Sequence, residues 1–133
     1  MEVKPLTDQL NVSGQISIDD VAALQAAGVK SIICNRPDHE EANQVLHSDI
    51  ANAAEKHGIA FVFMPITPGQ MTQDNVNEFS QSLNTLDKPI HAYCRSGMRS
   101  TSLWGLSQTL NGLSKERVLQ TAAEAGYDLS KLL

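Results

Sequence analysis

The chain has 133 residues, 41% of them hydrophobic, which is enough to bury one core without disulfides or metal ions to hold it. Its formal net charge of −5 at pH 7 argues against a nucleic-acid backbone or an anionic membrane surface as the main partner, because both favour clustered lysine and arginine. A small anion needs only local positive charge, so small anionic partners stay open. We expect one domain over residues 1–133.

The amino-terminal segment and the cysteines indicate the setting in which the protein works. No apolar run approaches the roughly 18 residues of a membrane span, and "MEVKPLTDQLNV" lacks the zones of a signal peptide, so a cytoplasmic protein is expected. Cys34 and Cys94 form neither a disulfide framework nor a C-x-x-C pair, and the four histidines have no metal-ligand spacing. We therefore expect no metal site and no other cofactor.

The first half of the chain alternates between strand and helix patterns. "LNVSG" predicts a short strand, and Ser17 with Asp20 resembles a capping box that opens a helix ending at Gly28. The branched, apolar run "VKSIIC" predicts a strand covered on both faces. After the turn "NRPDHE", apolar residues at helical spacing predict a helix from Glu41 to His57.

The second half repeats this alternation and ends in helices. "IAFVFMPI" predicts a strand, Thr72 caps a helix, and "PIHAY" predicts the last strand. Two further helices are expected, one from Arg99 to Gly112 and one over "SKERVLQTAAEAG". The whole pattern predicts an α/β fold: a central parallel sheet of four or five strands with helices on both faces. Ligands bind such sheets at the carboxyl ends of the strands.

The stretch "AYCRSGMRS" follows the last predicted strand and holds the main candidates for chemistry. A strand-to-helix turn exposes backbone N–H groups at the positive end of the helix dipole, so an anion is stabilised there. Gly97 lets the turn close, and Arg99 can add a planar pair of donors to an oxyanion. The same field favours the reactive thiolate of Cys94. Core packing is the alternative role for this cysteine, but the polar residues around it in the sequence favour a nucleophile.

Other notable residues have simpler interpretations. Cys34 lies in an apolar strand pattern, so core packing is favoured over a second or resolving thiol. His91, in the strand before the loop, can face the core or the site, and a structural role is favoured. The acidic turn with Asp38, Glu40 and Glu41 is interpreted as an ordinary helix start rather than a catalytic cluster.

Four segments together resemble a known family: "LNVSGQIS", "GVKSIICNRPDHEE", "FVFMPI" and "AYCRSGMRSTSLWGL". The resemblance is to the bacterial family of unknown function 442, the phosphatase-like domain of beta-lactamase hydrolase-like proteins, and it covers nearly the whole chain. It implies the fold of dual-specificity protein phosphatases, with an N-terminal strand beside a central parallel sheet. The family is also linked to sulfur metabolism, where the domain is treated as a rhodanese-like sulfurtransferase.

The two implied activities begin with the same nucleophile. A phosphatase thiolate attacks phosphorus and forms a phosphocysteine, whereas a sulfurtransferase thiolate attacks a sulfane sulfur and forms a persulfide. The resemblance implies that Cys94 is this nucleophile and that Arg99 clamps the negative oxygens. It implies substrate binding by the rest of the loop: Arg95, Ser96, Gly97, Met98 and Ser100.

Three details favour sulfur transfer over hydrolysis of a phosphate ester. Only Met98 stands between Gly97 and Arg99, so the loop is one residue shorter than the protein-phosphatase pattern and is similar to rhodanese loops. Tyr93 stands where the phosphatases have histidine. The loop after "FVFMPI" lacks the aspartate that protonates the leaving group in phosphatases.

We therefore expect a sulfurtransferase that uses thiosulfate or a persulfide together with a thiol acceptor. The alternative is a phosphatase that hydrolyses phosphomonoesters through a phosphocysteine, with Asp74 or Asp38 as the candidate general acid. Sequence elements that usually precede the loop in rhodaneses, such as Gly-His-Ile-Pro-Gly-Ala, are absent, so the phosphatase alternative stays open. A third interpretation is a non-catalytic module that binds an anion in the same loop.

Overall fold

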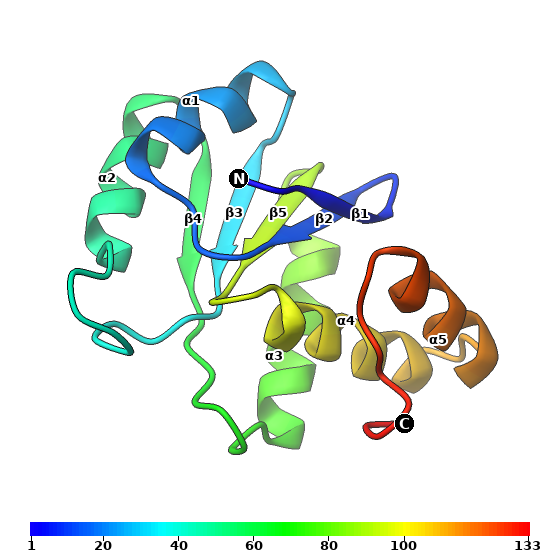
Figure 1. Ribbon diagram of the computed structural model, residues 1–133. Coiled ribbons are helices and arrows are strands. Elements are labelled where there is room, and N and C mark those ends of the chain that lie inside the picture. Colours follow the sequence, from blue (N-terminus) through cyan, green and yellow to red (C-terminus); the bar gives the residue numbers. More distant parts are fainter.

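The computed structural model describes residues 1–133, and five strands form one sheet in the order β1-β2-β5-β3-β4 (Figure 1). The strands are β1 (Lys4–Thr7), β2 (Leu10–Ser13), β3 (Ser31–Cys34), β4 (Ala60–Phe63) and β5 (Ile90–Tyr93). Strands β2, β5, β3 and β4 are parallel, as predicted. The prediction of a wholly parallel sheet is wrong at the edge, because β1 pairs with β2 in antiparallel fashion and the sheet is mixed. Only Asp8 and Gln9 join these two strands, and so short a connection cannot reach a parallel register.

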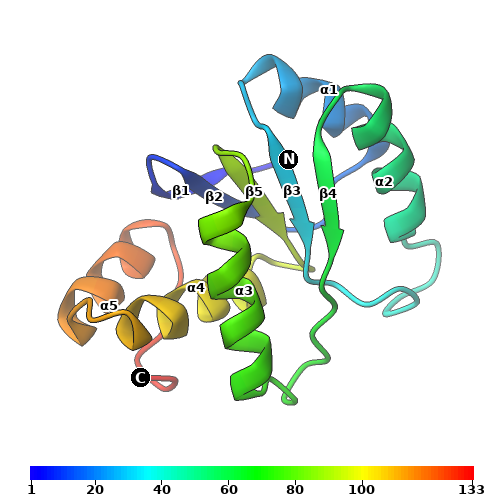
Figure 2. The same ribbon diagram turned by 180° about the vertical axis from the view of Figure 1, so that it is seen from behind.

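Helices cover both faces of the sheet, as predicted (Figure 2). They are α1 (Ile18–Ala26), α2 (His47–Lys56), α3 (Gln73–Thr85), α4 (Met98–Leu110) and α5 (Lys115–Glu124). One apolar cluster joins α1 and α2 to the sheet, and the other joins α3, α4 and α5 to its opposite face. The neighbours Ile32 and Ile33 on β3 belong to different clusters, and both are fully buried. Strand β3 is therefore covered on both sides, which explains its continuous apolar run.

The predicted start of helix α1 is confirmed. Ser17 accepts a hydrogen bond from the Asp20 amide, and the Asp20 carboxylate accepts one from the Ser17 amide at 2.8 Å. Thr72 forms the same reciprocal arrangement with Asn75 at the start of α3. These capping boxes satisfy amide groups that have no partner within the helix, so both helices begin at a defined residue.

The predicted helix from Glu41 to His57 is too long, because α2 begins only at His47. The carboxylate of Asp38 accepts hydrogen bonds from the main chain and from the ring of His47, at 2.9 and 2.7 Å. Segment 35–46 is a loop whose polar side chains bond within the loop and to His47, Gln15, Met64 and Arg99. A local pattern of apolar residues could not show these contacts.

Two of the predicted structural residues lie in the interior. Cys34 is buried in the cluster under α1 and α2, and its thiol donates to the carbonyl oxygen of Arg36 at 3.3 Å. His91 is fully buried in β5, where its ring bonds to the Ser13 hydroxyl at 2.8 Å and to the Asn11 side chain. Both residues are buried, which agrees with the core packing expected for Cys34 and the structural role expected for His91. None of the helices has the length and apolar character needed to span a bilayer.

Candidate active site

Cys94 is the first residue after β5, at the carboxyl edge of the parallel strands, and the loop that follows ends at the start of α4. Its sulfur accepts a hydrogen bond from the Gly97 amide at 3.1 Å. The side chain is fully buried. An amide hydrogen and the amino end of a 13-residue helix thus place positive potential against the sulfur.

The backbone at Gly97 requires glycine for two reasons. Its φ of 96° lies in the left-handed region, where a side chain is strained. A Cβ atom there would also lie 2.1 Å from the hydroxyl of Tyr127 and 3.3 Å from the carbonyl oxygen of Ser13. Gly97 therefore lets the loop pass close to both the sheet and the carboxyl-terminal segment.

Tyr127 reaches this loop from the segment that follows α5. Its hydroxyl donates to the carbonyl oxygen of Ser96 at 2.9 Å. Burial and, next, the negative charge of a Cys94 thiolate raise the pKa of the Tyr127 phenol. The phenol therefore keeps its proton and acts as a donor that braces the loop from outside.

Several main-chain amides of the loop have no partner within the protein. The Met98 amide donates to the Ser96 hydroxyl at 3.3 Å, and the Gly97 amide to the sulfur. The other amides of the loop and of the first helical turn donate to no protein atom: those of Arg95, Ser96, Arg99 and Ser100. Free amides at a helix amino end bind negatively charged oxygen atoms without any special side chain.

Arg99 lies at the start of α4 with its guanidinium largely covered by protein. Nη1 donates to Oε2 of Glu40 and to the carbonyl oxygen of Ile66, both at 2.8 Å, and Nη2 donates to Oε1 of Glu40 at 2.8 Å. The side chains of Arg99 and Glu40 are only 14% and 15% exposed. Arg99 is thus fixed in place by loops that follow two other strands, β3 and β4.

Glu40 is held by a second arginine as well. Nε of Arg36 donates to Glu40 at 3.0 Å, and the other guanidinium nitrogens of Arg36 donate to Glu41 and Gln15, each at 2.9 Å. Arg36 is 1% exposed. The hydrogen bond from Arg99, opposed by burial and reinforced by Arg36, holds the pKa of Glu40 below its usual value. Glu40 is therefore an ionised structural partner and not a proton donor.

The two candidate general acids lie elsewhere. Asp38 is bonded to His47 at the start of α2, and these bonds outweigh burial and lower the pKa of its carboxyl group. Asp74 is exposed in the first turn of α3 and forms no side-chain hydrogen bond. Neither carboxylate is bonded to the Cys94 loop. The loop after β4 approaches Arg99 with the carbonyl oxygen of Ile66 alone.

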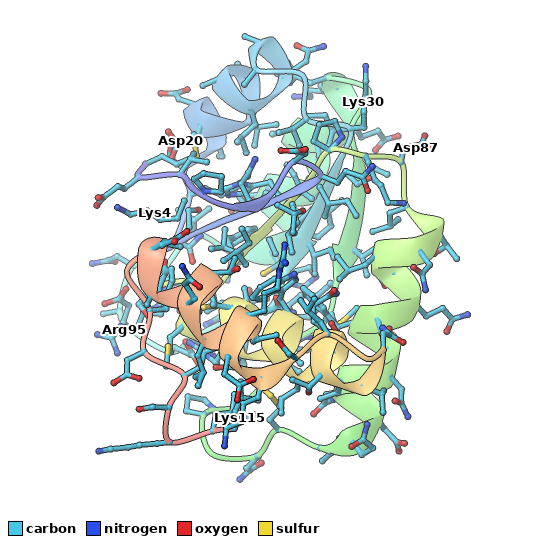
Figure 3. The ribbon with its side chains drawn as sticks, turned by 90° about the vertical axis from the view of Figure 1, so that its right-hand side faces the viewer. Lys4, Asp20, Lys30, Asp87, Arg95 and Lys115 are labelled. Carbon is cyan, nitrogen blue, oxygen red and sulfur yellow. The ribbon has the colours of Figure 1, made fainter.

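The remaining predicted residues of the loop divide into exposed and buried groups. Arg95 lies at the outside of the molecule (Figure 3), 62% exposed, with Glu41 at 3.8 Å. Ser96 and Met98 are also exposed. Ser100 is fully buried, and its hydroxyl donates to Oδ1 of Asn35 at 2.8 Å.

Arg36, Asn35 and Tyr127 were not predicted as site residues. The interpretation of Glu40 as part of a helix start is wrong, because α2 begins only at His47 and Glu40 contacts Arg99. Asn35, Arg36 and Glu40 follow β3 directly, in the segment "NRPDHEE", at the same sheet edge as Cys94. Their position after a parallel strand was the available signal. Tyr127 comes after the last helix, and no local pattern predicts its contact.

The chain is similar to known proteins in sequence and in fold. The chain is 30% identical over 132 residues to the beta-lactamase hydrolase-like protein of Xylella fastidiosa, covering 98% of this chain and 31% of that protein. The chain therefore spans about a third of the length of the curated relatives that it matches. It also resembles the crystal structure of a candidate phosphatase from Neisseria meningitidis, with 32% identity, a TM-score of 0.90, and 99% and 94% of the two chains covered.

A more distant structure shares the fold. The complex of TpbA from P. aeruginosa with phosphotyrosine has a TM-score of 0.71 at 15% identity, covering 96% of this chain and 75% of that chain. The family model for the phosphatase-like domain of beta-lactamase hydrolase-like proteins matches residues 2–111. Because the family model covers most of the chain, the protein belongs to this phosphatase-like family.

Proposed function

We propose that residues 1–133 form a catalytic domain that hydrolyses phosphate monoesters with Cys94 as the nucleophile. The observation that carries the proposal is the geometry at the start of α4: the Gly97 amide donates to the Cys94 sulfur, and neighbouring amides are free to hold oxygen atoms. Arg99, held by its ion pair with Glu40, lies at the start of the same helix and adds a guanidinium to the site. Such an arrangement presents a nucleophile and an oxyanion cradle to the same group.

The reaction has two steps in this proposal. The Cys94 thiolate attacks phosphorus, so that a sulfur–phosphorus bond forms as the bond to the ester oxygen breaks. The leaving alkoxide takes a proton from water. A second water then attacks phosphorus, the sulfur–phosphorus bond breaks, and inorganic phosphate leaves with the thiolate restored. The free amides and Arg99 stabilise the negative oxygens in both steps.

The family favours phosphorus over sulfur as the reacting atom. The matched family is phosphatase-like, and the well-matched Neisseria structure is described as a candidate phosphatase. A neighbour with the same fold binds phosphotyrosine. These findings do not support the sulfurtransferase that the loop length favoured, and they support its alternative.

The test is hydrolysis of an aryl phosphate by the wild type and by Cys94→Ser. We expect activity in the wild type and none in the variant, with a phosphorylated protein trapped by acid quenching only when Cys94 is present. Cys34→Ala is the matched control, because it removes the other cysteine, whose thiol donates to the Arg36 carbonyl oxygen and not to the Cys94 loop. Equal activity in wild type and Cys94→Ser would refute the proposal.

Sulfur transfer is the second candidate, and one specific observation favours it. Four residues separate Cys94 from Arg99, one fewer than in the protein-phosphatase pattern, and no carboxylic acid lies ready to protonate a leaving group. In this reaction the thiolate attacks the sulfane sulfur of thiosulfate, a persulfide forms, and sulfite leaves. A gain of one sulfur by mass, dependent on Cys94 and without phosphatase activity, would select this candidate.

A further inference from the structure

The carboxylate of Glu40 is the main contact of Arg99, and it leaves a defined part of the guanidinium available. Glu40 takes one hydrogen from Nη1 and one from Nη2, and Ile66 takes the second hydrogen of Nη1. The Nε hydrogen and the second Nη2 hydrogen donate to no protein atom. These two hydrogens lie on the same edge of the planar group, so they form a parallel pair that matches two oxygens of one anion.

Glu40 is itself held so that it cannot turn away. Arg36, which is almost fully buried, donates through Nε to the same Oε1 atom that accepts from Nη2 of Arg99. Glu41 and Gln15 occupy the other nitrogens of Arg36. The contacts therefore run from buried Arg36 to Glu40, and from Glu40 to Arg99 beside the Cys94 loop. Each member restricts the rotation of the next.

We propose that Glu40 is the positioning residue of this site: it binds one edge of Arg99 and so presents the Nε–Nη2 edge to two oxygens of the substrate. The inference rests on the proposed function, since it assigns Arg99 to an oxyanion. A guanidinium without such a partner samples many rotamers, and an error of about 1 Å in a catalytic group costs on the order of a hundredfold in rate. Glu40 acts through Arg99 and does not touch the reacting atoms.

The first test observes Arg99 directly by nuclear magnetic resonance of arginine side chains. The Arg99 signals are assigned as those that disappear in Arg99→Lys. We expect separate, slowly exchanging Nη signals for Arg99 in the wild type and averaged signals in Glu40→Gln. The matched control is Glu41→Gln, because Glu41 contacts Arg36 and exposed Arg95 but not Arg99. Titration with inorganic phosphate should move the Arg99 Nε signal in the wild type and in the control, and less in Glu40→Gln.

The second test is kinetic, with an aryl phosphate as substrate. Glu40→Gln should lower kcat by about tenfold to a hundredfold with a smaller change in KM, whereas Glu41→Gln, which leaves the Glu40–Arg99 pair in place, should lower kcat much less. If Glu40→Gln does not fold, Glu40→Asp keeps the charge beside Arg36 but is too short to reach both Arg99 nitrogens. It should show the same loss.

The results separate this inference from the proposed function. A protein without phosphatase activity refutes the proposed function, and the Arg99 signals then still decide whether Glu40 orders the guanidinium for phosphate. Unchanged Arg99 signals in Glu40→Gln would overturn the inference. A rise in kcat/KM would also overturn it, because the carboxylate would then compete with the substrate for Arg99.

Discussion

The hydroxyl of Tyr127 donates to the carbonyl oxygen of Ser96 across 31 positions of sequence, at 2.9 Å. Ser96 lies in the Cys94 loop, whereas Tyr127 follows the last helix and lies outside the segment 2–111 that the family model matches. This brace on the loop is therefore supplied by the carboxyl-terminal part of the chain.

Tyr127→Phe should loosen the loop with little effect on the fold. The variant loses one hydrogen bond, at a cost of about 1 kcal/mol in the free energy of unfolding. Because the bond holds the carbonyl next to the Gly97 amide, we expect a lower kcat for an aryl phosphate. Denaturant unfolding and steady-state kinetics measure the two effects. A wild-type kcat would show that the loop keeps its shape without the brace.

Gly97→Ala should abolish activity, and the chain offers a matched control. Gly97 and Gly112 have nearly equal φ values of 96° and 97°, so alanine costs about 1 kcal/mol of backbone strain at either site. Only at Gly97 would the new methyl group meet other atoms, those of Tyr127 and Ser13. Unfolding and kinetic measurements on Gly97→Ala and Gly112→Ala separate the effect of backbone strain from that of the steric clash with Tyr127 and Ser13. An active Gly97→Ala would contradict the close packing of this loop.

Buried His91 should make the protein less stable in mild acid. Burial lowers the pKa of His91 to about 4, from 6.5 in the exposed state. Between these values the unfolded chain binds a proton that the folded chain excludes. The free energy of unfolding should therefore fall by about 3 kcal/mol as the pH drops from 6.5 to 4, and this contribution should be constant above 6.5.

The comparison variant for this prediction is His91→Gln, which keeps polar atoms for Ser13 and Asn11 but has no group that titrates. Other acid-sensitive contacts, such as that between Asp38 and His47, are present in both proteins and cancel in the difference. Urea unfolding at a series of pH values gives both curves. Parallel curves would show that His91 does not carry the pH dependence.

Activity should depend steeply on the leaving group. Asp38 and Glu40 are held in their ionised forms by His47 and by two arginines, and Asp74 is not bonded to the loop. Without a positioned acid, a leaving alkoxide is not protonated in the transition state, and this help is worth about 10²–10⁴-fold in rate. Aryl phosphates with acidic phenols should react much faster than alkyl phosphates. Similar rates for both, measured as released phosphate, would reveal a general acid.

Much of the fold could be predicted because its signals are local. Branched apolar residues made β3 recognisable, and the Ser17–Asp20 pair marked the start of α1. The antiparallel β1 escaped prediction, since its four residues include Lys4 and Pro5 and lack an apolar pattern. The predicted helix from Glu41 is too long, because apolar spacing cannot show that Asp38 accepts a hydrogen bond from the His47 amide nine positions away.

The sequence by itself determined the Cys94 loop: Cys94, Gly97 and Arg99 are neighbours along the chain, and a strand followed by a helix places them at one sheet edge. Tertiary structure decided what surrounds that loop. Glu40 and Ile66 reach Arg99 only because β3 and β4 end beside β5, and Tyr127 reaches Ser96 only because the carboxyl-terminal segment returns to the loop. Contacts between segments far apart in sequence depend on how strands and helices pack, and local residue patterns carry no record of them.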